Sequence, residues 1–150
     1  MTISYYPISL NLRNTPCLVV GGGKVAERKV NSLLMSQGSI TVVSPELTEG
    51  LKVLVQKGAI KYRQREYEKD DLIGVFLVIS AADSKEVNRM VARDCFERGI
   101  LINAVDDPQF CNFIVPAVVR RGDLSISIST GGKSPALARK IREELELKYG

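Results

Sequence analysis

The sequence predicts an α/β fold, in which a doubly wound parallel sheet is followed by a small α+β region. Short apolar runs alternate with amphipathic segments of helical period through the first two thirds of the chain. The first apolar run ends in three glycines, and a helix-like segment starts there. After about residue 112, two strand-like runs flank a tight-turn sequence, and one helical segment follows. Strand–helix alternation of this kind is typical of a parallel sheet covered by helices.

The bulk composition is that of a soluble globular protein. The chain has 150 residues, of which 45% are hydrophobic and 25% are charged. This length suits one domain, or one domain with a small appendage. No apolar run approaches the ~20 residues that a membrane span requires. The first residues, Met1–Tyr6, lack the basic-then-apolar order of a signal peptide, so we expect a cytoplasmic location.

Several classes of site are disfavoured by the residues the chain lacks. Histidine is absent, which removes catalytic triads that depend on imidazole and the commonest transition-metal ligand. The three cysteines, Cys17, Cys95 and Cys111, have no paired spacing, so we expect neither a disulfide framework nor a metal site. The net charge of +4 fits an anionic ligand. Nucleic acid is a weaker candidate, because no dense Lys/Arg stripe with interleaved aromatics is present.

The first strand and helix are the clearest elements. Residues 17–20 form a continuous apolar run, which suits a strand buried on both faces, and Cys17 is expected in the core. Apolar residues recur with helical spacing from Val25 to about Ser36. Further strands are expected at 40–43, 60–63, 75–79 and 101–105, and further helices at 47–57 and 84–98. Right-handed crossovers between such strands favour the doubly wound topology.

The pattern changes in the last quarter of the chain. Phe113–Arg120 and Leu124–Ser129 read as two strands joined by a tight turn, with Pro116 indicating an edge position or an irregularity. Ser134 and Pro135 are typical of a helix start, as the N-cap and first helical residue. The final helix carries apolar residues at a spacing of four. Its apolar stripe needs a partner, for which a second chain is a reasonable candidate.

The glycines after the first strand predict a dinucleotide site. Gly21, Gly22, Gly23, Lys24, Val25 and Ala26 match the form G-x-G-x-x-A. Gly21 allows a tight turn, Gly23 lets the backbone approach a pyrophosphate, and Ala26 keeps helix and strand close together. The free N–H groups of the helix N-terminus favour phosphate binding. The alternative is a glycine turn that only packs. We interpret residues 1–112 as a Rossmann NAD-binding domain.

The end of the second strand is the usual place for a residue that binds the adenosine ribose. An acidic residue is missing directly at the strand end, where Val43 is followed by Ser44, Pro45 and Glu46. Ser44 or Glu46 is the candidate, with Pro45 packing nearby. No arginine is present here to bind a 2′-phosphate, which favours NAD over NADP. The small residue Ala82, after the fourth strand, would leave room for a ribose.

Three motifs in order resemble one family. Val19–Lys29 resembles the opening of the precorrin-2 dehydrogenases, which occur alone and as the N-terminal module of siroheme synthase. Asn103–Pro108 and Cys111–Pro116 are similar to the central stretch of this family. Ser129–Arg139 is similar to its late signature, so the resemblance covers essentially the whole chain.

The resemblance implies an activity and several residue roles. It implies NAD-dependent oxidation of the anionic tetrapyrrole precorrin-2 to sirohydrochlorin, and in some members insertion of ferrous iron. The family's aspartate matches Asp106, and its nucleotide contacts match the glycine turn with Lys24 and Val25, and Pro45 with Glu46. It also implies an intertwined homodimer, in which residues 113–150 form the dimerisation and substrate region. Family members normally carry a further helical segment, so the chain is expected to be a shortened or truncated member.

The chemistry fits a carboxylate base. Oxidation transfers a hydride to NAD and a proton to a base, and Asp106 follows the fifth strand, at the edge where such sheets bind ligands. The choice of Asp106 over its neighbour Asp107 rests on the Asn-x-x-Asp spacing, and the alternative for this stretch is a simple turn. The substrate candidates are Asn103, Arg120, Lys133 and Ser134. A rival function, a non-catalytic NAD-sensing module, would explain the glycine turn but not Asp106 or the basic second region.

Overall fold

The computed structural model describes residues 3–150, which fall into two compact units. The sheet unit comprises Ser9–Asn112. The hairpin unit joins residues 3–8 to Phe113–Gly150. Among the described residues, every helix is too short or too polar to cross a membrane.

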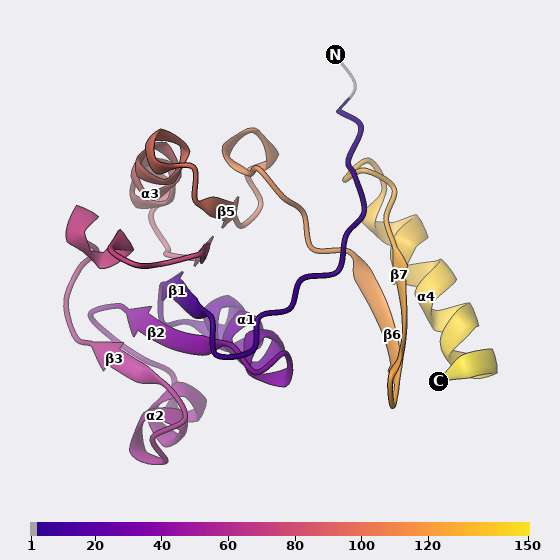
Figure 1. The fold of residues 1–150 in the computed structure, drawn as a ribbon, viewed down its shortest axis with the longest axis horizontal. Helices are drawn as coiled ribbons and strands as arrows, with labels where there is room; N and C mark the ends of the chain where they lie inside the picture. The colour runs from indigo at the N-terminus through magenta and orange to yellow at the C-terminus, as the bar shows by residue number, and fades with distance from the viewer. Residues whose placement is uncertain (1–2) are drawn as a thin grey trace. The chain divides into compact units, whose positions relative to one another are not determined.

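The sheet unit is built on five parallel strands in the order β3-β2-β1-β4-β5 (Figure 1). The strands are β1 (Pro16–Val20), β2 (Ser39–Val43), β3 (Lys61–Arg63), β4 (Leu77–Ser80) and β5 (Leu101–Ala104). The central strand β1 pairs with β2 on one side and with β4 on the other. This arrangement confirms the predicted doubly wound parallel sheet.

Three helices cover the sheet: α1 (Lys24–Met35), α2 (Glu49–Gln56) and α3 (Lys85–Arg98). Right-handed crossovers place α1 and α2 on one face and α3 on the other (Figure 1). The chain winds outward from β1 to β3, and then crosses to β4 on the opposite side of β1. The point where the order reverses therefore lies between β1 and β4. Open α/β sheets bind ligands at the carboxyl ends of the strands at this position.

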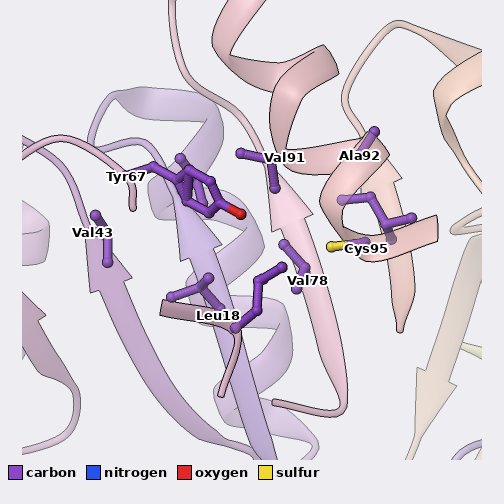
Figure 2. Close-up of a cluster of buried hydrophobic side chains, with 10 residues drawn as sticks. Leu18, Val43, Tyr67, Val78, Val91, Ala92 and Cys95 are labelled. Carbon is purple, nitrogen blue, oxygen red and sulfur yellow. The ribbon is translucent and has the colours of Figure 1, made fainter. Parts of the chain in front are cut away.

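The core lies between the sheet and its helices. Residues Cys17–Val20 of β1 are at most 3% exposed, as expected for a strand covered on both faces. A cluster between the sheet and α3 contains side chains from β1, β2, β4 and the helix (Figure 2). Tyr67 packs in this cluster and donates its hydroxyl hydrogen to Asp94 Oδ2 on α3 at 2.8 Å. The buried phenol therefore ties the loop after β3 to α3.

An ion-pair network around one buried carboxylate lies in the connection from β3 to β4 and was not predicted from the sequence. A 3₁₀ helix, η1 (Lys69–Leu72), contains Asp71, whose side chain is 1% exposed. Its carboxylate accepts hydrogen bonds from Arg63, from both terminal nitrogens of Arg65 and from the backbone N–H of Glu68. Burial alone would raise the pKa of Asp71, but these hydrogen bonds outweigh burial and lower the pKa to about 2.

The hairpin unit contains two antiparallel strands and one helix. They are β6 (Ala117–Arg121), β7 (Leu124–Ile128) and α4 (Pro135–Tyr149). The first strand begins at Ala117 and not at Phe113 as predicted, consistent with Pro116 having no N–H for a ladder hydrogen bond. The predicted helix start is confirmed, because the Ser134 hydroxyl accepts the N–H of Leu137 at 3.2 Å.

Candidate nucleotide-binding and catalytic site

A cavity of about 530 Å³ opens at the carboxyl ends of β1, β2 and β4. It therefore lies at the position where the strand order reverses. The structure brings seven of the predicted cofactor residues together in its lining: Gly21, Gly22, Gly23, Ser44, Pro45, Glu46 and Ala82. Residues that the sequence analysis did not single out complete the wall, among them Thr48, Tyr67, Val87 and Met90.

Two of the glycines are required by the fold itself. Gly21 has a φ of 123°, and a Cβ there would lie 2.4 Å from the carbonyl oxygen of Ala81. A Cβ on Gly22 would lie 1.9 Å from the carbonyl oxygen of Glu46. The steric need for Gly22 was not foreseen, because it arises from a loop 24 residues along the chain that presses on the turn.

Gly23 differs, because a Cβ there would meet no atom within 4 Å. It is the N-cap residue of α1 and supplies no side-chain cap. The other described α-helices are capped by the hydroxyls of Thr48, Ser84 and Ser134. An open backbone face beside an uncapped helix N-terminus fits a pyrophosphate, so the residues present fit a dinucleotide. Lys24 and Val25 begin α1, but they are not among the lining residues.

The wall after β2 is held by hydrogen bonds. The Ser44 hydroxyl donates to the carbonyl oxygen of Glu46 at 2.8 Å. The carbonyl oxygen of Ser44 accepts the hydroxyl of Tyr62 at 2.7 Å. Ser44 is 8% exposed, whereas Glu46 is exposed at the cavity. Of the two predicted ribose ligands, Glu46 thus has its carboxylate accessible, while the hydroxyl hydrogen of Ser44 is engaged within the loop.

The opposite wall, after β4, is fixed by a buried asparagine that the sequence analysis missed. Asn88 of α3 accepts hydrogen bonds from the Ser80 hydroxyl at 2.6 Å and from the N–H of Ala82 at 3.0 Å. Its amide donates to the carbonyl oxygen of Ala82 at 2.9 Å. The conformation of the turn that carries Ala82 is therefore fixed by its hydrogen bonds to α3. A polar residue on the inner face of a predicted helix was the one available signal.

The two adjacent aspartates have different surroundings. Asp106 is exposed and adopts a left-handed backbone conformation with a φ of 62°. The side chain of Asp107 is 15% exposed, and its Oδ2 accepts from Nε of Arg89 at 3.1 Å. Asp107 is thus engaged in an ion pair that anchors the turn, and the turn presents Asp106 to solvent. Asp106 is therefore the more exposed of the two carboxylates.

Asp106 lies close enough to α1 for its charge to affect the pKa of Lys29. Burial lowers the pKa of Lys29, and the charge of Arg28 lowers it further, while the Asp106 carboxylate opposes both effects. Asp106 itself is not among the described lining residues of the cavity. Asn103 precedes Asp106 by three residues, and it lies on β5, where it pairs with Ile79 of β4.

The other predicted substrate residues belong to the hairpin unit. Arg120 is exposed on β6, and Lys133 is exposed in the loop before α4. Ser134 is the N-cap residue of α4, and its hydroxyl is engaged by the helix. Within residues 3–150, no group of three or more potential ligands could hold a metal ion.

Comparison with known proteins identifies the family. Residues 8–117 match the model of a family described as putative NAD(P)-binding, and residues 121–147 match one described as sirohaem biosynthesis protein central. A solved structure of SirC, a precorrin-2 dehydrogenase, superposes with a TM-score of 0.86 and 32% sequence identity. The alignment covers 97% of this chain and 72% of SirC. The chain belongs to the precorrin-2 dehydrogenase family. The resemblance inferred from three motifs is confirmed, and so is the class of dinucleotide cofactor.

Curated relatives in this family are longer proteins. The chain is 46% identical to the siroheme synthase of Methylobacillus flagellatus over 140 residues, and 45% identical to siroheme synthase 1 of Aeromonas salmonicida over 144 residues. These alignments cover 93% and 96% of the chain. The chain spans 30% and 31% of the length of these two relatives.

Proposed function

We propose that the protein catalyses the NAD-dependent oxidation of precorrin-2 to sirohydrochlorin. The observation that carries this proposal is the glycine-lined cavity at the strand-order reversal, in a chain that superposes on a precorrin-2 dehydrogenase over 97% of its length. A non-catalytic NAD-sensing module would also have this cavity, but it would need no catalytic carboxylate. The family membership and the exposed carboxylate of Asp106 support catalysis.

In this proposal, bound NAD supplies the hydride acceptor. Gly21 and Gly23 shape the backbone against which the pyrophosphate lies, and the uncapped N-terminus of α1 offsets its charge. Lys24 and Val25, the first residues of α1, complete this contact. Asp106 takes the proton that leaves the macrocycle as the hydride departs. Its exposure allows it to reach a substrate outside the sheet unit's core.

The proposed cofactor is NAD and not NADP. Glu46 places a carboxylate at the cavity, where the ribose of the adenosine half is expected. A carboxylate accepts hydrogen bonds from a ribose 2′-hydroxyl but repels a 2′-phosphate. Residues 43–48 contain no arginine that could offset this repulsion.

The hairpin unit is proposed to serve substrate binding and dimerisation. We assign the sheet unit, Ser9–Asn112, to nucleotide binding, and residues 113–150 to a homodimer contact and to substrate. Arg120 and Lys133 are exposed cations suited to the carboxylates of precorrin-2, with Asn103 and Ser134 as polar partners.

Ferrous iron is proposed as a second substrate, for which Asp106 would accept the pyrrole protons. The cytoplasmic location also stays a prediction.

A turnover assay tests this function. Purified protein is mixed with NAD and precorrin-2, and the absorbance of sirohydrochlorin and of NADH is followed. We expect turnover with NAD that exceeds turnover with NADP at equal concentration. Adding ferrous iron tests the second reaction by the appearance of the metallated product. Tight NAD binding by calorimetry without any turnover would favour the sensor function instead.

A further inference from the structure

Thr48 connects three parts of the nucleotide-binding wall. Its backbone N–H donates to the carbonyl oxygen of Gly22, within the glycine turn, at 2.9 Å. Its hydroxyl donates to Glu27 Oε1 on α1 at 2.5 Å, and accepts the N–H of Leu51 on α2 at 3.2 Å. One residue therefore joins the glycine turn, α1 and α2, and it also lines the cavity.

Glu27 is held at the N-terminus of α2. A Cβ on Gly50 would lie 2.5 Å from Glu27 Oε1, so only glycine allows the carboxylate this close approach to the first turn of α2. A negative charge is favourable at a helix N-terminus. The carboxylate is thus directed at the first turn of α2 and at Thr48.

The loop from Ser44 to Thr48 is consequently fastened at both ends. Tyr62 holds its start through the carbonyl oxygen of Ser44. Thr48 holds its end against Gly22 and Glu27. Between these points, Glu46 packs its carbonyl oxygen where a side chain on Gly22 would be. The shape of the glycine turn and the place of the Glu46 carboxylate therefore depend on the same fastening.

We propose that Thr48 and Glu27 are positioning residues for the dinucleotide, and that their hydrogen bond holds the wall of the cavity in its binding geometry before NAD arrives. This inference rests on the proposed NAD-binding function of the cavity. A loop that is ordered in advance loses less conformational entropy on binding, so affinity is higher. Neither residue takes part in hydride or proton transfer, so the effect belongs in the affinity for NAD and not in the rate at saturation.

A set of variants separates positioning from general stability. Thr48→Val is close in shape to threonine but has no hydroxyl, whereas Thr48→Ser keeps the hydroxyl. Glu27→Ala removes the acceptor on α1. Thr15→Val is the matched control. The Thr15 hydroxyl donates to the carbonyl oxygen of Arg13 at 3.3 Å, just before β1 begins, whereas the cavity lies at the other end of this strand. Circular dichroism and thermal unfolding first establish the temperature at which every variant is folded.

Calorimetric titration with NAD then measures the dissociation constant of each variant. We expect Thr48→Val and Glu27→Ala each to weaken binding by roughly tenfold, and Thr48→Ser and Thr15→Val to bind as the parent chain does. The double variant should bind no more weakly than either single variant, because both remove the same bond. In the turnover assay, KM for NAD should rise while kcat at saturating NAD is unchanged.

Unchanged NAD affinity in folded Thr48→Val would overturn the positioning role and leave the proposed function intact. Additive losses in the double variant would also overturn it, because the two side chains would then act independently. A parent chain that binds no NAD at millimolar concentration would instead overturn the proposed function, and the positioning role with it.

Discussion

Gly22 and Gly23 are neighbours in one turn, but each is glycine for a different physical reason. At Gly22 a side chain would collide with the protein's own backbone, 1.9 Å from the carbonyl oxygen of Glu46. At Gly23 a side chain would meet no protein atom within 4 Å, so its absence matters only when a ligand is present. The two positions thus distinguish a requirement of folding, at Gly22, from a proposed requirement of binding, at Gly23.

Gly23→Ala is expected to leave folding almost unchanged and to weaken NAD binding by roughly tenfold, because the methyl group would occupy the proposed place of the pyrophosphate. Its φ of −89° and ψ of −166° suit alanine. Thermal unfolding and NAD calorimetry measure the two effects. Gly22→Ala is the comparison and should lower the melting temperature as well. A Gly23→Ala protein with normal affinity would argue against phosphate contact at this residue.

The backbone at Asp106 determines which variant is informative. A left-handed φ of 62° is tolerated by aspartate and asparagine but is strained for alanine. Asp106→Asn keeps the turn and removes the proposed base, so we expect kcat to fall by about 10²–10⁴ while NAD affinity is retained. Stopped-flow absorbance at saturating NAD measures this. If Asp107→Asn, which loses the Arg89 ion pair, were the more damaging change, the roles of the two aspartates would have to be exchanged.

At the scale of elements, the connection between β3 and β4 is held by charge. The buried carboxylate of Asp71 compensates for a short strand and a single 3₁₀ turn, which bury few apolar side chains of their own. Arg63 and Arg65 are partly exposed, so the network is best described as a buried acceptor with two donors at the surface. Such an arrangement stabilises the fold only while the acceptor is ionised.

This element should therefore lose stability in acid. The pKa of Asp71 is about 2 in the folded chain and 3.8 ordinarily, so its contribution is present above pH 4 and is lost as the pH falls toward 2. The loss amounts to about 1–2 kcal/mol of unfolding free energy. Urea midpoints at pH 5 and pH 2.5 measure it, and Asp71→Asn should show a smaller difference between the two pH values. An equal difference in the variant would assign the acid sensitivity to other carboxylates.

Prediction from the sequence succeeded where one residue pattern decides the structure. The strand at β1 was predictable, because burial on both faces requires an unbroken apolar run. The glycine turn was predictable, because the G-x-G-x-x-A spacing after an apolar strand is typical of a tight turn into a helix. The bond from Thr48 to Glu27 and the network around Asp71 were not, because they depend on side-chain directions across turns. Nor could the sequence show that Gly22 is constrained by a distant loop.

At the scale of the whole molecule, the hairpin unit has little core of its own. Among its described residues only Val119 and Ala138 are buried hydrophobics, whereas Leu137 is 48% exposed and Leu147 is 93% exposed. A unit with so little buried apolar surface is marginal unless another surface covers it. This observation supports the proposed homodimer.

Sedimentation equilibrium should therefore give a mass of twice the 16.5 kDa of the chain. Replacing both Leu137 and Leu147 by glutamate should shift the equilibrium to the monomer, because burying the new charges is unfavourable. Lys85→Glu, on the exposed surface of α3 in the sheet unit, is the control for added negative charge and should remain dimeric. A monomeric parent chain at micromolar concentration would contradict the homodimer.

The core surrounding β1 and α3 also governs the reactivity of sulfur in a protein proposed to carry out an oxidation. Burial raises the pKa of Cys17 to about 11 and is the main cause that raises the pKa of Cys95 to about 12. Burial likewise raises the pKa of Cys111, whose Sγ lies 3.2 Å from the carbonyl oxygen of Ala104. Since the thiolate is the reactive form, peroxides and electrophiles should attack the folded chain slowly. The core thus shields Cys17 and Cys95, and modification of these two thiols becomes a marker of chains that have unfolded.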